Sequence, residues 1–104
     1  MALKIPGSND MAARGRTGLE VLDVEIVAEM ATSLGGAGRR VEQAMAQLNA
    51  WTPADGERAS LVKAAADAVY AYFIQRELCG LRRHDDVIRE HGIPREVLVR
   101  LGAK

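Results

Sequence analysis

A chain of 104 residues fits one small domain, and its 48% hydrophobic and 27% charged residues are typical of a folded globular protein. Fourteen Lys and Arg balance fourteen Asp and Glu, so the chain lacks the excess of positive charge that usually marks a nucleic-acid-binding protein. A single cysteine excludes an internal disulfide framework and a zinc cage built from several cysteines.

The first 17 residues are predicted to be a mobile leader. Pro6, Gly7 and Gly15 lie among polar residues, and no apolar run there has the length of a secretory signal. The later apolar stretches are interrupted by charge well before the roughly 18–20 residues that a membrane span needs. We therefore expect a cytoplasmic protein without a membrane segment, in which Cys79 stays reduced.

Residues 18–104 are predicted to form a single helical domain whose first helix covers about 18–50. Thr17 and Glu20 have the spacing of a capping box. Apolar or small residues then recur every three or four positions, which is the period of one helix face. These residues are Leu19, Leu22, Ile26, Met30, Leu34, Ala37, Val41, Met45 and Leu48.

Three glycines, Gly35, Gly36 and Gly38, lie within this first helix. They cost a helix roughly 3 kcal/mol relative to alanine. The apolar stripe nevertheless passes through them without losing phase. We therefore expect a continuous helix, with any bend at Gly35–Gly36.

A second helix is predicted over residues 53–79. Thr52 suits the N-cap, Pro53 suits the first helical position, and Asp55 complements the positive end of the helix dipole. Gly80 is the expected C-terminal cap. The middle of this helix is apolar on nearly all sides, so we expect it to be buried on most faces.

Two short helices are predicted to follow, over residues 83–91 and 94–101. Gly92 and Gly102 stand at their ends, and Pro94 stands at the start of the second one. No strand pattern is found anywhere in the sequence. The predicted fold class is therefore all-α, with a long antiparallel helical hairpin and two short C-terminal helices.

The lengths of the two main helices predict a homodimer. At 1.5 Å per residue they would be about 48 and 39 Å long, whereas a compact chain of this size has a radius of gyration of about 13 Å. Two short helices leave apolar surface on such a hairpin uncovered. A second copy would cover it and complete a helical bundle.

The turn of the hairpin predicts which residues face each other. If it centres near Thr52–Pro53, antiparallel partners have residue numbers that sum to roughly 105. Small residues of the first helix would then face large residues of the second, as a close-packed core requires. The predicted helix-packing residues are Gly35, Gly36, Gly38, Val69, Tyr70, Tyr72 and Phe73.

The residues with reactive or metal-binding side chains do not form a recognisable site. Cys79 lies at a predicted helix C-terminus, where the helix dipole disfavours a thiolate, so we expect a plain buried thiol. His84 and His91 are seven residues apart and lack a fourth ligand for zinc. We expect no catalytic residue, no cofactor and no metal, and we keep an enzyme or metal protein built on Cys79, His84 and nearby carboxylates as an alternative.

Charged residues at the end of the second helix are candidates for structural ion pairs. They are Arg76, Glu77, Arg82 and Asp85. Such pairs would fix how the short C-terminal helices dock. The alternative is a solvated charged rim, since surface ion pairs contribute little to stability.

Residues 83–104 have the outline of a helix-turn-helix. Arg95, Arg100 and Lys104 could then contact phosphates. Against this, the second helix is very short, Glu96 lies on it, and the whole chain is neutral. A helical hairpin that caps the bundle is therefore the favoured interpretation.

Three segments of the chain resemble a bacterial family of small helical proteins that is classed as a domain of unknown function. They are Leu34-Gly-Gly-Ala-Gly-Arg-Arg40, Phe73-Ile-Gln-Arg-Glu-Leu-Cys-Gly-Leu-Arg82 and His91-Gly-Ile-Pro-Arg-Glu-Val-Leu98. The resemblance covers about residues 18–102. It implies a small all-helical bacterial protein and brings no activity, ligand or catalytic residue with it.

The sequence thus leads to one main functional hypothesis. We expect a non-enzymatic helical protein that acts through homodimerisation and contacts with other proteins. The alternative is a DNA-binding regulator that uses residues 83–104.

Overall fold

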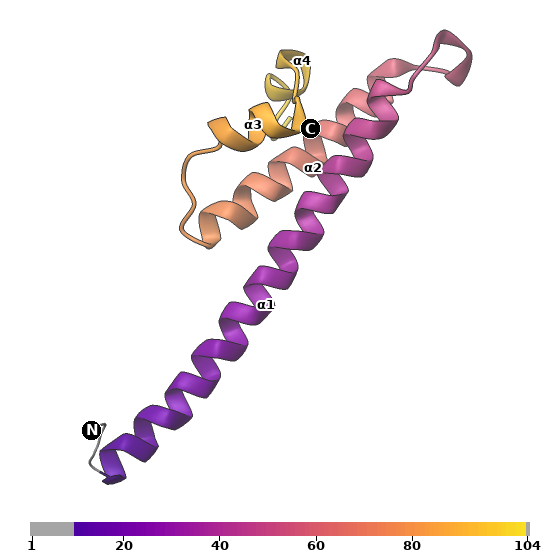
Figure 1. The fold of residues 1–104 in the computed structure, drawn as a ribbon. Helices are drawn as coiled ribbons and strands as arrows, with labels where there is room; N and C mark the ends of the chain where they lie inside the picture. The colour runs from indigo at the N-terminus through magenta and orange to yellow at the C-terminus, as the bar shows by residue number, and fades with distance from the viewer. Residues whose placement is uncertain (1–9, 104) are drawn as a thin grey trace. The chain divides into compact units, whose positions relative to one another are not determined.

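The computed structural model describes residues 10–103, with side chains from residue 20 onward, and every regular element among them is a helix (Figure 1). The elements are α1 (Asp10–Asn49), the 3-10 turn η1 (Pro53–Asp55), α2 (Arg58–Leu78), α3 (Asp85–His91) and α4 (Arg95–Leu98). The predicted all-α fold class is confirmed. The chain divides into two units, residues 1–32 and residues 33–104, and each is described by itself below.

The second unit holds the hydrophobic core. The part of α1 that belongs to it packs against α2, as the predicted hairpin requires, and α4 packs on α2. Val41 of α1, Val69 of α2 and Val97 of α4 are fully buried, so the centre of the core lies where these three helices meet. The other buried core residues are Met45, Leu48, Val62, Ala65, Ala66, Phe73, Val87 and Ile93.

Helix α1 is continuous through its three glycines, as the unbroken apolar stripe predicts. Its start differs from the prediction. The helix begins at Asp10, so residues 10–17 of the predicted leader are helical, and the capping box at Thr17 does not mark a helix start. Met, Ala and Arg are good helix formers, and they carry the helix through Gly15. Residues 1–9 lie outside the described part of the chain.

The connection between α1 and α2 is longer than expected. Thr52 and Asp55 do form a cap, in which the Thr52 N–H donates to Asp55 Oδ2 at 2.8 Å. This cap starts only the short turn η1, because Gly56 at φ +91° leads the chain out of the helical conformation. Helix α2 therefore begins at Arg58, five residues after the predicted start.

Two glycines end helices in the left-handed conformation that their sequence positions predict. After α2, the Leu81 N–H donates to Arg76 O at 2.9 Å, and the Gly80 N–H donates to Glu77 O at 3.0 Å. This pair of bonds is a Schellman motif, and Gly80 has φ +88°. Gly92, at φ +61°, ends α3 with the same pattern of bonds.

The two short helices are shorter than predicted. Helix α3 begins at Asp85 rather than residue 83, and α4 has only the four residues Arg95–Leu98. Beyond α4 the chain continues in tight turns, in which the Arg100 N–H donates to Val97 O at 3.1 Å. Gly102 at φ +75° then prevents further helix.

Only one of the three glycines of α1 faces an aromatic side chain. A Cβ on Gly38 would lie 3.4 Å from Cε1 of Tyr72, so the ring rests directly on the backbone of α1. At Gly35 and Gly36 the nearest side chains are those of Arg39 and Arg40, so the prediction that these two glycines face the aromatic cluster is wrong. The register is shifted because the connection between the helices extends to Glu57.

Helix α2 is buried on fewer sides than its apolar middle predicts. Val69 and Phe73 lie in the core. Tyr70, Ile74 and Leu78 are 41–68% exposed. The spacing of four residues between them places all three on one face of α2. The second unit therefore presents an apolar stripe to solvent.

Candidate functional site

Residues 20–32 of α1, called here the exposed α1 segment, carry large aliphatic side chains that no other part of the described chain covers. Five of them are 52–67% exposed: Val21, Leu22, Val24, Ile26 and Val27. Leu22 and Ile26 share a face, because they are four residues apart, and Val24 points to another side. These residues therefore form apolar patches on more than one side of the helix, and exposed apolar patches often mark interaction sites.

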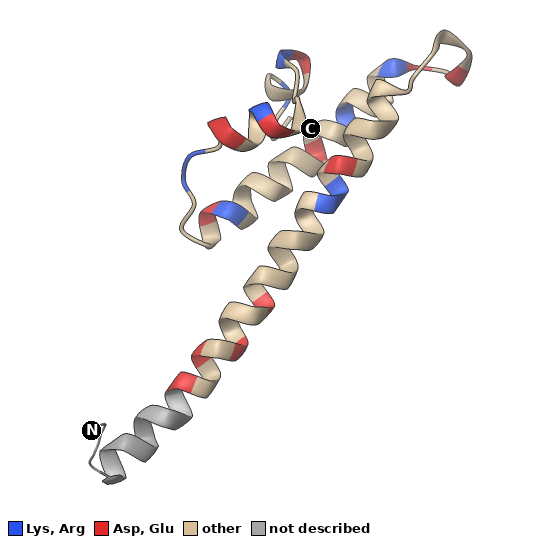
Figure 2. Ribbon diagram, viewed as in Figure 1, with Lys and Arg blue, Asp and Glu red and all other residues tan. Residues whose placement is uncertain are grey.

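The charged residues of α1 are separated by sign along the helix. Glu20, Asp23, Glu25 and Glu29 are the only charged residues between positions 20 and 38, and all four are acidic (Figure 2). Arg39 and Arg40 follow. None of these six side chains forms an ion pair with another side chain that the structure describes.

A buried arginine organises the junction between α2 and α3. Arg76 is 8% exposed, and its Nε donates a hydrogen bond to His84 Nδ1 at 3.1 Å. Its Nη2 donates to Arg83 O at 2.8 Å and lies 3.5 Å from Asp86 Oδ1. The guanidinium group also lies over the ring of Tyr72, 5.8 Å from its centroid. One side chain thus fixes the end of α2 to the start of α3.

The imidazole of His84 completes this network. Its ring stacks on Phe73 with the planes 6° apart and the centroids separated by 4.1 Å. Because Nδ1 accepts the bond from Arg76, that nitrogen carries no proton. Nε2 therefore carries the hydrogen and donates it to Glu77 Oε2 at 3.0 Å. This arrangement orients the His84 ring between Arg76 and Glu77.

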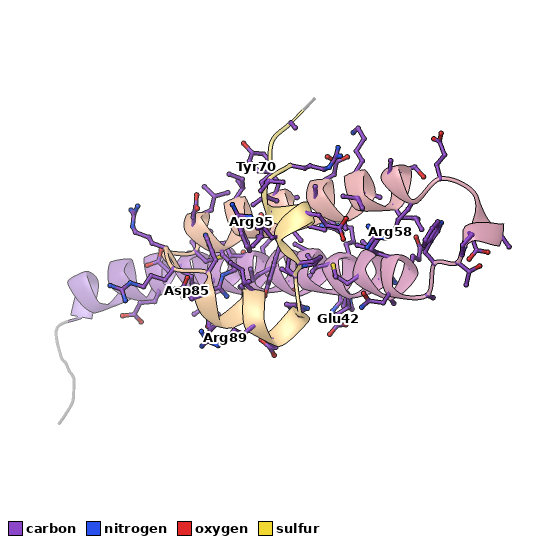
Figure 3. The ribbon with its side chains drawn as sticks, turned by 90° about the horizontal axis from the view of Figure 1, so that it is seen from above. Glu42, Arg58, Tyr70, Asp85, Arg89 and Arg95 are labelled. Atoms are coloured by element: carbon purple, nitrogen blue, oxygen red, sulfur yellow. The ribbon has the colours of Figure 1, made fainter. Side chains whose placement is uncertain are left out.

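An open cleft of about 570 Å³ lies beside this network, and Arg82, Arg83 and Arg89 line it together with Arg76. Asp85 and Asp86 are the acidic residues of its lining, so the wall carries more positive than negative charge. Guanidinium groups in such a setting can pair with carboxylates or phosphates. Figure 3 labels Asp85 and Arg89, which both belong to α3.

The predicted structural ion pairs fall into two groups. Arg76 forms an ion pair with Asp86, whereas Glu77 is joined to His84 by a hydrogen bond. Arg82 and Asp85 line the cleft but form no ion pair with any residue that the structure describes. The network is therefore built around Arg76 alone.

An ion pair that the sequence reasoning missed joins α2 to α4. Arg58 Nη1 and Nη2 donate to the two carboxylate oxygens of Glu96 at 2.5 and 2.6 Å. The guanidinium group of Arg58 also lies over the ring of Trp51, 5.9 Å from its centroid. The hydrogen bond from Arg58 lowers the pKa of Glu96, and the bond to Glu96 raises the pKa of Arg58. No local pattern could predict this pair, because 38 residues separate its members.

The residues expected to contact phosphates do not sit on a recognition helix. Arg95 and Arg100 are exposed, and Lys104 lies outside the described residues. Helix α4 is one turn long, and its Glu96 is occupied by Arg58. The helix predicted over 94–101 is present but shorter than expected, because the chain turns after Leu98.

The candidate ligands for a metal are separated from one another. His84 binds Arg76 and Glu77, whereas His91 meets the ring of Tyr72 edge-on at 5.8 Å. Cys79 is a free, half-buried thiol. Among the described residues, no three His, Cys, Asp or Glu side chains lie together as a metal site.

These observations define an all-helical protein in which a long helix packs on a second one and two short helices complete the core. The chain belongs to a family of unknown function, DUF6665, which it matches over residues 5–104. The resemblance to a family of unknown function, inferred from the sequence, is thereby confirmed. No curated protein and no solved structure matches the chain. Across the described residues, no helix has both the length and the apolar character to cross a membrane.

Proposed function

We propose that this chain is a non-enzymatic helical protein that works as a homodimer, through contacts between proteins, and that the exposed α1 segment forms the contact. One observation carries the proposal. The aliphatic side chains of Val21, Leu22, Val24, Ile26 and Val27 are each more than half exposed on consecutive turns of one helix. A helix that is apolar on several sides is stable in water when a partner covers it.

The exposed apolar surface favours association. Full burial of one such side chain contributes about 1.5–3 kcal/mol. Leu22 and Ile26 share one face, so two copies bring four side chains to an interface on that face, and covering their exposed halves contributes on the order of 5 kcal/mol. This contribution lies at the lower end of the association cost of about 4–15 kcal/mol. The stripe of Tyr70, Ile74 and Leu78 on α2 adds further apolar surface to the second unit.

The charges of the chain favour a second copy as the partner. The exposed α1 segment is acidic, and Arg39 and Arg40 on the same helix supply the complementary charge. A neutral chain also has no net charge to repel a copy of itself. The protein therefore carries both halves of a complementary interface.

DNA binding is a weaker alternative for this geometry. Helix α4 has four residues, about 6 Å, which is too short to lie along a major groove. Glu96, next to Arg95, adds negative charge where phosphates would approach.

Light scattering on a matched pair of variants tests the proposal. Ile26→Lys places a charge on the exposed α1 segment, and we expect it to shift the protein from dimer to monomer. Val99→Lys makes the same change at an aliphatic residue that is 66% exposed outside α1, and we expect it to stay dimeric. Equal masses for the two variants would contradict the proposed contact surface.

A further inference from the structure

Three exposed arginines line the cleft beside Arg76. Arg82 and Arg83 lie on the connection between α2 and α3, where Figure 2 shows basic residues, and Arg89 lies on α3. None of the three forms an ion pair with a side chain that the structure describes, although two aspartates belong to the same lining. The fold therefore holds three guanidinium groups at one cleft without pairing them to its own carboxylates.

The backbone that carries two of these arginines is held in place. The Leu81 N–H donates to Arg76 O at 2.9 Å, and Arg76 Nη2 donates to Arg83 O at 2.8 Å. The connection is thus tied to α2 on both sides of Arg82. A site whose backbone is fixed in advance loses less conformational entropy when a ligand binds.

The charges of the lining favour a ligand with two negative charges. Asp86 lies 3.5 Å from Arg76 and offsets its charge. The lining then holds three further arginines and one further carboxylate, that of Asp85, which leaves a surplus of two positive charges. Glu77 accepts a hydrogen bond from His84 and does not belong to the lining.

A phosphate monoester matches this lining better than a carboxylate does. It carries a charge of about −1.5 to −2 at neutral pH and presents three strong acceptor oxygens. Guanidinium groups bind such oxygens through paired, charge-assisted hydrogen bonds. A single carboxylate has one negative charge and two oxygens, so it would leave part of the positive charge uncompensated.

We propose that this cleft binds a small molecule that carries a phosphate group, and that Arg82, Arg83 and Arg89 contact the phosphate. Arg76 is a positioning residue, because it holds the backbone of Arg83. The proposal does not depend on the homodimer, since every residue of the lining lies on one chain.

The size of the cleft fits a ligand larger than a free phosphate ion. Its volume of about 570 Å³ lies within the range of roughly 300–1,000 Å³ that is usual for small-molecule sites. Gly80 and Leu81 supply an uncharged part of the wall, against which the rest of the molecule would lie.

Titration of the full chain with phenyl phosphate tests the proposal, because this probe joins a phosphate monoester to an uncharged ring. Backbone amide signals are followed by NMR at neutral pH and physiological salt, which screens the general attraction of anions to exposed charges. We expect saturable shifts that are largest at residues 80–89. Phthalate, a dicarboxylate with the same ring, should bind at least tenfold more weakly.

A matched pair of variants assigns the binding to the cleft. Arg82→Gln combined with Arg89→Gln should weaken the binding of phenyl phosphate at least tenfold, since two of the three guanidinium groups are lost. Arg95→Gln is the control, because Arg95 is exposed on α4, lies outside the lining and forms no ion pair with the described residues. We expect this control to bind as the native chain does, and circular dichroism checks that both variants are folded.

Three results would overturn the proposal. One is the absence of saturable shifts at residues 80–89 with millimolar phenyl phosphate. Another is an equal loss of affinity in the double variant and in Arg95→Gln, which would mean that the probe binds exposed arginines without a site. The third is binding of phthalate as tight as that of phenyl phosphate, which would mean that the cleft does not select phosphate.

Discussion

Arg58 and Glu96 form two parallel hydrogen bonds, at 2.5 and 2.6 Å, that join the first turn of α2 to α4 across 38 residues of sequence. Paired bonds between a guanidinium group and a carboxylate fix orientation as well as distance. This pair therefore holds α4 at a defined position on α2. It lies at the surface, so its contribution to stability is modest and depends on pH and salt.

Replacement of Glu96 by glutamine is expected to lower the melting temperature at neutral pH and to have little effect in acid. The bond from Arg58 lowers the pKa of Glu96 in the folded chain. The pair therefore stabilises the fold above the ordinary pKa of a glutamate, and this stabilisation is lost as the pH falls through the lowered value. Thermal unfolding of both proteins across the acid range measures it. A gap between the two melting temperatures that stays constant with pH would contradict this role.

Replacement of Arg76 by alanine is expected to destabilise the fold by about 2–4 kcal/mol, because a buried network loses its centre. Arg83 O and His84 Nδ1 would both lose their donor. Arg76→Lys keeps the charge but cannot make the same set of bonds, so it should fall between alanine and the native chain. Urea unfolding gives the free energies.

The matched control for Arg76 is Arg82→Ala, since Arg82 lies in the same cleft but is exposed and forms no ion pair with the described residues. We expect this change to alter the free energy of unfolding by less than about 0.5 kcal/mol. If Arg76→Ala and Arg82→Ala lowered the free energy of unfolding equally, the hydrogen bonds of Arg76 would not be what holds α3 against α2.

Substitutions at Gly38 test the contact between α1 and α2. Gly38→Leu should destabilise the fold by about 1–3 kcal/mol, because the larger side chain would have to displace Tyr72. In Gly38→Ala the new Cβ would sit at 3.4 Å, an ordinary van der Waals contact, and alanine favours helix by about 1 kcal/mol. We therefore expect Gly38→Ala to be neutral or stabilising. An unchanged melting temperature for Gly38→Leu would show that Tyr72 does not pack there in solution.

Local signals in the sequence predict much of the helical framework. The apolar stripe through Val41, Met45 and Leu48 identifies the face of α1 that is buried against α2. Gly80 and Gly92 identify two helix ends, because a left-handed residue is needed where the chain leaves each helix. These features depend on residues that are near one another in the chain.

The helix starts are less predictable, because competing signals overlap there. Thr17 has the pattern of a cap, yet the helix begins at Asp10. Thr52 is a real cap, yet the helix it starts ends after one turn at Gly56. In both places the capping residue alone does not decide where the helix runs. The residues before Thr17 extend α1 toward its start, and Gly56 after Thr52 ends the turn that Thr52 begins.

The site is predictable only where its residues are close in sequence. Arg76 and Glu77 were candidates from sequence, and both take part in the network at the α2–α3 junction. The pairing of Arg58 with Glu96 and the contact of Gly38 with Tyr72 depend on the register between helices. The register depends on the length of the connection between α1 and α2 and on the packing of α4 against α2. Neither can be predicted from residues that are close in sequence.

Sedimentation equilibrium of the full-length chain at micromolar concentration tests self-association most directly. One copy has a mass of 11.2 kDa. We predict a species of twice that mass, which persists on dilution and dissociates when Ile26 is replaced by lysine. A single species of 11.2 kDa at every concentration would contradict a homodimer held by the exposed α1 segment.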